Sequence, residues 1–395
     1  MSPDQLPEVL ARAFSIFSSQ RPGPVHLSIP IDVITAAADT VDIKPWSLPT
    51  RPAANLDALQ RAAVLLQSAK RPVIALGGGS ADAFTSIQEL VERVDAPVTL
   101  THNAKGVIPP GHPLLVASSP SYKPVRDLYH DADVVLGIGT EFSETDYDFF
   151  FDGGFSLGGS LIRVDIDSAQ LSRNARPELA ICADAELAIT ALLPLLQSTR
   201  RNGQERTAAV NDQLKALDSS DYQVFLDTLQ RALPGAAVMG DSTQPAYFAA
   251  AQYHAPQPRR FASAATGYGT LGYALPAAFG ARLGLPETPV IALIGDGGLQ
   301  FTINELSTAV EAELSVAVVV WNNERYEMIA QNFDAAGMKP IACDIHTPDF
   351  LAIAQGYGCR AVQVTSLSEL EAALVASQDF AGPTVIEARE EDFLQ

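Results

Sequence analysis

The chain has 395 residues, which is long enough for two or three domains that each bury a core of their own. Hydrophobic residues make up 47% and charged residues 18%, a composition typical of a globular protein rather than a disordered one. Lys and Arg number 26 against 46 Asp and Glu, so the formal net charge is -20. Because this charge repels phosphate backbones and anionic lipids, we expect neither nucleic acid nor a membrane as a partner.

The sequence also bears on the compartment. The longest apolar runs, such as Val316–Trp321, are far too short to span a bilayer. The N-terminal residues lack the basic stretch followed by an apolar one that marks a signal peptide. The cysteines are odd in number and widely spaced, which favours reduced thiols over a disulfide framework or a metal site (Cys182, Cys343, Cys359). We therefore expect a cytoplasmic protein.

The N-terminal segment contains too few elements for a domain. Ser2 and Gln5 form a capping-box pattern that predicts a helix through Phe17, and a turn then leads into an expected strand, Val25–Ile29. One helix and one strand cannot bury a core, so we interpret residues 1–34 as the end of a domain whose beginning is missing. A Pro- and Ala-rich stretch without periodicity follows and predicts a linker over residues 35–56.

Beyond this linker, continuous apolar runs alternate with amphipathic stretches of helical length. Apolar runs without polar alternation are typical of strands buried on both faces, so the pattern predicts two α/β domains, each with a mostly parallel sheet between helical layers. The domains are expected over residues 57–197 and 218–395, with a polar linker over 198–217. The expected strands are Pro72–Leu76, Asp133–Ile138, Ser160–Asp165, Ala236–Met239, Val290–Ile294 and Ser315–Trp321, and the clearest helices are Ala83–Val94, Asn304–Glu313 and Ser368–Ser377.

The strongest functional signal lies at two strand ends. Gly295-Asp296-Gly297 follows one expected strand and precedes a helix, and Asn322-Asn323 ends the next expected strand. The carboxyl edge of a parallel sheet is where α/β folds bind ligands. Mg²⁺ prefers hard oxygen ligands shared with phosphate, and Asp296, Asn323 and the carbonyl of Arg325 offer three. Gly297 and Gly298 would let backbone N–H groups approach a diphosphate.

This pattern resembles the cofactor motif of thiamin diphosphate enzymes, in which GDG is followed in the mid-twenties by NN. A bare GDG is weak, because glycine and aspartate are common turn residues. The Asn pair at the family's spacing carries the interpretation. The resemblance implies thiamin diphosphate and Mg²⁺ as cofactors, with Asp296, Asn323 and Arg325 as metal ligands.

Two further segments are similar to this family. In Thr266–Ala278, the resemblance makes the Gly269 carbonyl an acceptor for the aminopyrimidine and Leu271 an apolar wedge; the alternative is a glycine-rich loop before a packing helix. Gly240–Thr243 matches a diphosphate contact, although Asp241 suits an anion only if its side chain points away. The implied cofactor-binding residues are Gly240, Asp241, Ser242, Thr243, Gly269, Leu271, Gly295, Asp296, Gly297, Gly298, Asn323, Arg325, Tyr326, Glu327 and Met328.

The middle domain resembles the central domain of the acetolactate synthase and oxo-acid decarboxylase branch. Some relatives hold FAD in this domain, and Gly77–Gly79 has the composition of a dinucleotide loop. We favour a tight turn instead, so FAD is considered but not favoured. The resemblance covers only the tail of the pyrimidine-binding domain. It implies that the glutamate that activates the pyrimidine is absent, so that this chain has no catalytic residue of its own.

The residues after the Asn pair bear on the reaction. In acetolactate synthases a glycine precedes the residue matching Met328 and a tryptophan follows Gln331, whereas this chain has Glu327 and Asn332. These substrate-pocket candidates favour a decarboxylase of a 2-oxo acid, and the continuation, Pro340–Phe350, is similar to the subgroup acting on 5-guanidino-2-oxopentanoate. Glu327 either faces a cationic substrate or is a solvated turn residue.

Two other functions stay open. One is an acetolactate synthase-like carboligase, which would release an acetohydroxy acid rather than an aldehyde. The other is an inactive fragment or assembly subunit. The partners expected from the resemblance are a small-molecule 2-oxo acid and either further copies of the chain, as a dimer or tetramer, or a separate chain that supplies the pyrimidine-binding domain.

Overall fold

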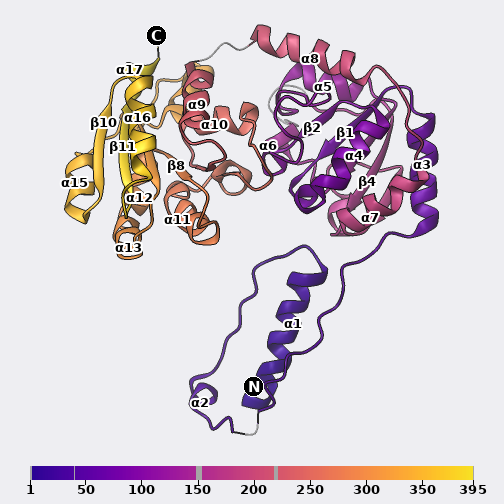
Figure 1. Cartoon of the computed structure of the whole chain (residues 1–395), viewed down its shortest axis with the longest axis horizontal. Coiled ribbons are helices and arrows are strands. Elements are labelled where there is room, and N and C mark those ends of the chain that lie inside the picture. The colour runs from indigo at the N-terminus through magenta and orange to yellow at the C-terminus, as the bar shows by residue number, and fades with distance from the viewer. Residues whose placement is uncertain (1, 40, 148–153, 218–220, 395) are drawn as a thin grey trace.

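A computed structural model describes residues 2–39, 41–147, 154–217 and 221–394. Figure 1 shows two α/β bodies side by side, with an N-terminal arm that extends away from both. Each body has one sheet in which every pair of neighbouring strands is parallel. The fold is therefore the predicted one, two α/β/α layered units with parallel sheets.

The first unit has a five-stranded sheet of order β2-β1-β3-β4-β5. Helices cover both of its faces. Its strands are β1 Pro72–Leu76, β2 Val98–Leu100, β3 Val134–Ile138, β4 Ser160–Asp165 and β5 Leu179–Cys182, and its helices are α3 Leu56–Ser68, α4 Phe84–Val94, α5 Lys123–His130, α6 Glu144–Tyr147 and α7 Ala185–Leu192. Short 3-10 turns complete it at η2 Gly78–Ala83, η3 His102–Ala104, η4 Gln170–Ser172 and η5 Leu193–Leu195.

The second unit has a six-stranded sheet of order β10-β11-β9-β8-β6-β7. Its strands are β6 Ala237–Gly240, β7 Phe261–Ser263, β8 Val290–Gly295, β9 Ala317–Asn322, β10 Arg360–Val364 and β11 Thr384–Arg389. Its helices are α9 Asp221–Ala232, α10 Gln244–Gln252, α11 Ala274–Gly284, α12 Asp296–Thr302, α13 Glu305–Glu311, α14 Glu327–Ala335, α15 Phe350–Tyr357, α16 Leu367–Ser377 and α17 Glu390–Phe393, with a 3-10 turn at η6 Ala264–Thr266.

The strands are buried on both faces, as the uninterrupted apolar runs predict. In β8, Ile291 and Leu293 pack into the cluster on one face of the sheet, whereas Val290, Ala292 and Ile294 pack into the cluster on the other. This alternation follows from the two-residue period of a strand. The six strands predicted for the two α/β units are confirmed within two residues at each end, because they lie in the core where burial decides the structure.

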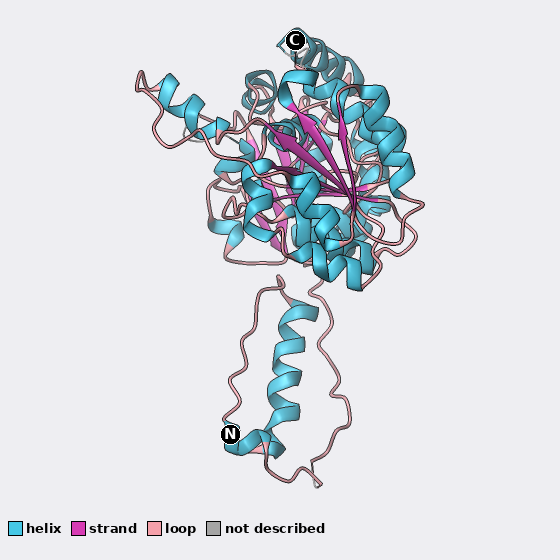
Figure 2. Ribbon diagram, turned by 90° about the vertical axis from the view of Figure 1, so that its left-hand side faces the viewer, coloured by secondary structure: helices cyan, strands magenta, loops and turns pink. Residues whose placement is uncertain are grey.

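The N-terminal arm departs from one prediction. Helix α1 Leu6–Ser19 follows the 3-10 turn η1 Pro3–Gln5, and the backbone N–H of Ser2 donates to Gln5 Oε1 at 2.8 Å, as one half of the capping box. The predicted strand Val25–Ile29 is wrong: this extended segment makes no backbone hydrogen bond within the described part of the chain. A strand needs a neighbour, and none of the described strands lies beside it. The arm also contains α2 Ile31–Ile34. Figure 2 shows the whole arm projecting below the sheets.

The segment expected as a polar linker contains a packed helix. Helix α8 Gly203–Leu217 lies beside α5 over the first unit (Figure 1), and its Val210 and Leu214 join the core on that face. Its apolar positions are sparse, which is why composition alone suggests a linker. No helix in the described residues is long and apolar enough to cross a membrane.

Candidate cofactor site

A cavity of about 170 Å³ lies at the carboxyl ends of β6, β8 and β9. The chain turns from β6 to β7 on one side of the sheet and returns to β8 on the other, so the cavity lies where the strand order reverses, the usual ligand position in such sheets. Its lining residues are Ser242, Thr243, Gln244, Tyr247, Gly269, Leu271, Gly295, Asp296, Gly297, Gly298, Asn323, Arg325, Tyr326, Glu327, Met328 and Ile329.

Asp296 is the first residue of α12 and only 2% exposed. Burial raises the pKa of its carboxyl group to about 6, although backbone N–H groups of Gly297 and Glu324 act in the opposite direction. Its Oδ2 atom is buried and has no hydrogen-bond partner. A buried carboxylate oxygen without a partner is costly unless a cation binds it. This atom therefore fits the role of metal ligand.

The two asparagines at the end of β9 have different roles. Asn322 is buried, and its amide joins two elements: Nδ2 donates to Glu387 at 2.6 Å and Oδ1 accepts from the Glu324 N–H at 3.2 Å. Asn323 lines the cavity, and its Nδ2 donates to Glu390 Oε2 at 3.3 Å. Because Glu390 holds the amide nitrogen, the oxygen is the atom available to a ligand; it accepts from the Arg325 N–H at 3.3 Å and has a second lone pair. Asn322 thus fixes the turn, and Asn323 offers the ligand.

The turn after Asn323 is held against the chain around residue 344. Arg325 forms an antiparallel bridge with Asp344, and the Tyr326 N–H donates to the Cys343 carbonyl at 2.8 Å. Tyr326 in turn crowds Gly297, where an added Cβ would lie 2.6 Å from the ring. A side chain at Gly297 would push this wall inward, so the glycine lets the turn and the start of α12 come together.

The loop before α11 lines the cavity from the other side. Gly269 and Leu271 both face it, as expected for an aminopyrimidine cradle. The Gly269 carbonyl already accepts from Ser242 Oγ at 3.1 Å, and a carbonyl oxygen has a second lone pair for another donor. Leu271 is partly buried. The hydroxyl of Ser242 thus ties the loop to the end of β6.

Two residues predicted to contact the cofactor do not line the cavity. Gly240 ends β6 and packs on α10, where an added Cβ would lie 3.1 Å from the Cβ of Ala246. Asp241 is fully buried and points away from the cavity, with its carboxylate accepting backbone N–H groups of the loop before α11. The predicted conflict between Asp241 and an anion is thereby removed.

Sequence reasoning missed three lining residues: Ile329 on α14, and Gln244 and Tyr247 on α10. The last two matter most. Both line the cavity from the first turns of α10, and the Gln244 Nε2 donor is buried without a partner. An unpaired donor at a helix N-terminus suits an anionic group such as a diphosphate. The Gly240–Thr243 motif ends one residue before Gln244. A predicted helix beginning at Gln244 would have indicated that these residues face the cavity.

Glu327 and Asn332 have different positions on α14. Glu327 begins the helix, lines the cavity and is 22% exposed at its side chain, with Oε2 at 3.4 Å from Arg325 Nη1. Asn332 is exposed and is not among the lining residues. Five residues along an α-helix turn a side chain well away from the starting face, which explains the difference. Asn332 therefore does not form the wall of this cavity.

Comparison with known proteins agrees with this geometry. Residues 241–388 match the family model of the thiamine pyrophosphate enzyme C-terminal TPP binding domain, and residues 59–192 match that of its central domain. A probable 2-ketoarginine decarboxylase from Pseudomonas aeruginosa is 37% identical over 98% of this chain and 70% of its own length. The chain belongs to the thiamine pyrophosphate enzyme family.

Other members of the family are similar at lower identity. The large subunit of acetolactate synthase isozyme 1 from Escherichia coli is 29% identical over 98% of this chain and 70% of its own length. The structure of benzoylformate decarboxylase from Polynucleobacter necessarius shares the fold, with a TM-score of 0.83 at 24% identity over 100% of this chain and 75% of that one. These enzymes are lyases and transferases, and this chain is an enzyme of the same family.

Family membership assigns thiamin diphosphate with Mg²⁺ as the cofactor, and the residues of the cavity fit both. Oxygen atoms of Asp296, Asn323 and Arg325 would hold the metal, and Gln244 would donate to the diphosphate. When bound, the cofactor supplies a carbanion nucleophile and an electron sink. The chain would contribute binding and orientation, and Leu271 would offer an apolar side chain to the cofactor.

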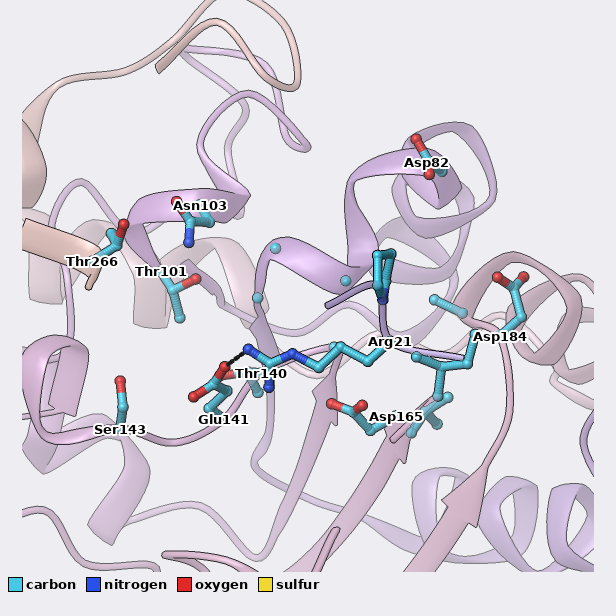
Figure 3. A pocket seen from close by; sticks show the side chains of 18 of the residues that line it. Arg21, Asp82, Thr101, Asn103, Thr140, Glu141, Ser143, Asp165, Asp184 and Thr266 are labelled. Atoms are coloured by element: carbon cyan, nitrogen blue, oxygen red, sulfur yellow. Dashed lines mark hydrogen bonds and ion pairs between the residues drawn. The ribbon is translucent and has the colours of Figure 1, made fainter. Parts of the chain in front are cut away.

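A larger cavity of about 420 Å³ lies at the carboxyl edge of the first sheet, the position at which FAD was considered (Figure 3). Its glycine run does not offer a phosphate cradle. The N–H groups of Gly77, Gly79 and Ser80 already donate to backbone carbonyls, and a Cβ at Gly77 would lie 2.1 Å from the Gly139 oxygen. The run is therefore the tight turn that we favoured.

The charges in this larger cavity also oppose a dinucleotide. Arg21 reaches across the cavity to Glu141, as Figure 3 shows, and Asp165 lies close by. Arg51 pairs with Asp184 at 2.8 Å, so both of these arginines are held by carboxylates. Arg259 also lines the cavity and pairs with Asp82 at 2.7 Å. A diphosphate would therefore meet acidic groups and three cations that are already paired. The residues present do not fit FAD.

Proposed function

We propose that this chain forms the diphosphate-binding part of a thiamin diphosphate-dependent decarboxylase whose substrate is a 2-oxo acid with a cationic tail, such as 5-guanidino-2-oxopentanoate. The observation that carries the substrate class is the carboxylate of Glu327 on the cavity wall. The similarity to a probable 2-ketoarginine decarboxylase supports the same class.

The charges around Glu327 favour a cation. Arg325 contacts both Glu327, at 3.4 Å, and Asp344, at 3.2 Å from its Nε atom. Two carboxylates therefore share one guanidinium, and the mouth of the cavity keeps one negative charge in excess. A guanidinium on the substrate would neutralise this charge through a charge-assisted hydrogen bond, whereas the methyl group of pyruvate would not.

Substitution of Glu327 tests this proposal. Hydrogen bonds to charged groups contribute about 1.5–3 kcal/mol, so Glu327→Gln should lower kcat/KM for the guanidino substrate about tenfold to a hundredfold in the holoenzyme, and much less for pyruvate. Asp344→Asn is the comparison variant, because Asp344 pairs with the same Arg325 but is 90% exposed and outside the cavity. It should lower kcat/KM for the guanidino substrate much less than Glu327→Gln does. Equal losses on both substrates would place Glu327 in the cofactor turn and remove the basis for a cationic substrate.

We further infer that a pyrimidine-binding domain packs against the arm and that the functional assembly contains more than one chain. The inward face of α1 and the returning segment form an apolar groove lined by Leu10, Phe14, Ile43 and Trp46. Phe14 is 53% and Ile43 86% exposed, which is unusual for residues that share one apolar patch. Sedimentation velocity should show a species larger than one chain, and a monomer at all concentrations and with added partner domain would contradict this assembly.

A further inference from the structure

Asp241 is a buried carboxylate whose bonds all point to backbone N–H groups. It directly follows β6, and its own N–H donates to the Leu293 carbonyl of β8 at 2.8 Å. Its Oδ1 accepts from Ser242 at 2.9 Å and Gly272 at 3.2 Å, and its Oδ2 accepts from Ala274 at 2.9 Å. No cation pairs with Asp241 among the described residues. Backbone amides, most of them from one loop, therefore stabilise its charge.

Two hydroxyl groups also hold this loop, through its carbonyl oxygens: Ser242 Oγ donates to Gly269 at 3.1 Å and Thr302 Oγ1 donates to Gly272 at 3.0 Å. Gly269 and Gly272 both have positive φ angles, 65° and 84°, so the backbone between them follows a path that other residues rarely adopt. Tyr273 is the N-cap of α11 and makes no side-chain cap hydrogen bond. The first N–H groups of a helix need acceptors. Asp241 supplies one from a distant strand, where its negative charge also suits the helix N-terminus.

The same carboxylate lies against the start of α12. A Cβ added at Gly298 would lie 2.6 Å from Asp241 Oδ1 and 3.2 Å from its Cγ. Gly298 lines the cofactor cavity on its other side, and Leu271 lines it from the loop. Asp241 therefore stands between the two walls and fixes how far apart they are.

We propose that Asp241 is a positioning residue that holds the Gly269–Leu271 loop in the conformation that receives the aminopyrimidine ring. This proposal rests on the proposed function, since it concerns the same cofactor. The loop offers the Gly269 carbonyl and the Leu271 side chain to the ring end of the cofactor. The diphosphate end meets Gln244 and the carboxylate of Asp296, and Asp241 makes a hydrogen bond to neither of them. Asp241 should therefore matter for the ring end far more than for the diphosphate end.

Asp241→Asn tests this separation. The amide keeps the shape but turns one acceptor into a donor that faces an N–H group. Titration calorimetry with Mg²⁺ should show affinity for thiamin diphosphate lowered at least about tenfold, because a charge-assisted hydrogen bond is lost. Affinity for inorganic pyrophosphate with Mg²⁺ should fall less than about threefold, because this probe has no ring. Hydrogen exchange should accelerate at Gly272 and Ala274 and stay unchanged in the first sheet.

Two further variants keep the proposal testable if Asp241→Asn affects folding. Gly272→Ala leaves the carboxylate in place but displaces the N–H that donates to it, because φ is 84° and the added Cβ would lie 2.8 Å from Thr302 Cγ2. It should cause the same selective loss for thiamin diphosphate. Asp184→Asn is the matched control: Asp184 is also buried and accepts from a helix N-terminus, the Leu187 N–H, but in the first unit. It should leave both affinities unchanged.

Equal losses for both probes in the Asp241 and Gly272 variants would overturn the positioning role while leaving the proposed function intact. Undiminished thiamin diphosphate affinity in these variants would overturn it too. If the wild-type protein bound neither probe, the proposed function would fail first and the inference with it.

Discussion

Asp296→Asn should make the cofactor-free protein more stable while removing its response to the cofactor. Asp296 is only 2% exposed and its Oδ2 has no partner, so its ionised form is disfavoured in the fold. The rise in its pKa from 3.8 to about 6 corresponds to about 3 kcal/mol of unfavourable free energy at pH 7. Asparagine carries no charge but replaces one oxygen that accepts backbone N–H groups, so we expect a net gain of about 1–2 kcal/mol.

The pH dependence of the unfolding free energy independently tests whether the charge of Asp296 destabilises the fold. The folded pKa is raised above the unfolded value, so the contribution of Asp296 to stability is fully present below about pH 4 and is lost as the pH rises through about 6. The stability of the Asn variant relative to the wild type should therefore be greatest above pH 6 and should fall by up to about 3 kcal/mol toward pH 4. The opposite slope would show that the carboxylate is stabilised by its surroundings.

Unfolding by urea, followed by Trp321 fluorescence, measures this effect in the second unit. Trp321 is buried and packs edge-on against Phe225, whereas the exposed Trp46 of the arm is best replaced by Phe in both proteins. With Mg²⁺ and thiamin diphosphate at about a hundred times Kd, the wild type should gain about 2.7 kcal/mol and the Asn variant almost nothing. An Asn variant that is less stable without cofactor, or gains as much with it, would refute the reasoning.

Two other outcomes follow from named contacts. Gly297→Ala should weaken binding of Mg²⁺ and thiamin diphosphate at least about tenfold in calorimetry, because the added Cβ would lie 2.6 Å from the Tyr326 ring; Gly280→Ala, with nothing within 4 Å, should bind normally. Burial lowers the pKa of His254 to about 4, so its neutral form stabilises the fold above pH 6.5 and this contribution is lost as the pH falls to 4. Between pH 7 and 4, the unfolding free energy of the wild type should therefore drop by up to about 3 kcal/mol more than that of His254→Gln. Parallel pH profiles of the two proteins would exclude this role.

The parts of the structure that sequence could predict are those decided by local pattern. The strands are buried on both faces and therefore have uninterrupted apolar runs, and Asp296 and Asn323 lie at strand ends that a parallel sheet brings to one edge. The predicted strand Val25–Ile29 failed because a strand also requires a neighbour, which a sequence pattern does not contain.

The details of the site depend on contacts between distant segments. Asp241 turns away from the cavity because backbone N–H groups of a later loop donate to its carboxylate, as the bond from Ala274 shows. Gln244 faces the cavity only because α10 begins there, and Asn332 is on another face of α14 from Glu327. Residue types and order do not reveal these directions, since each is fixed by tertiary packing.

The most direct measurement of the central claim is calorimetric titration of thiamin diphosphate into the wild-type protein, with Mg²⁺ in one experiment and with EDTA in the other. Binding that saturates at one cofactor per chain with Mg²⁺ and vanishes with EDTA is the expected result, because the buried Asp296 oxygen needs the cation. No binding with Mg²⁺, or the same affinity in EDTA, would contradict the assignment of this cavity.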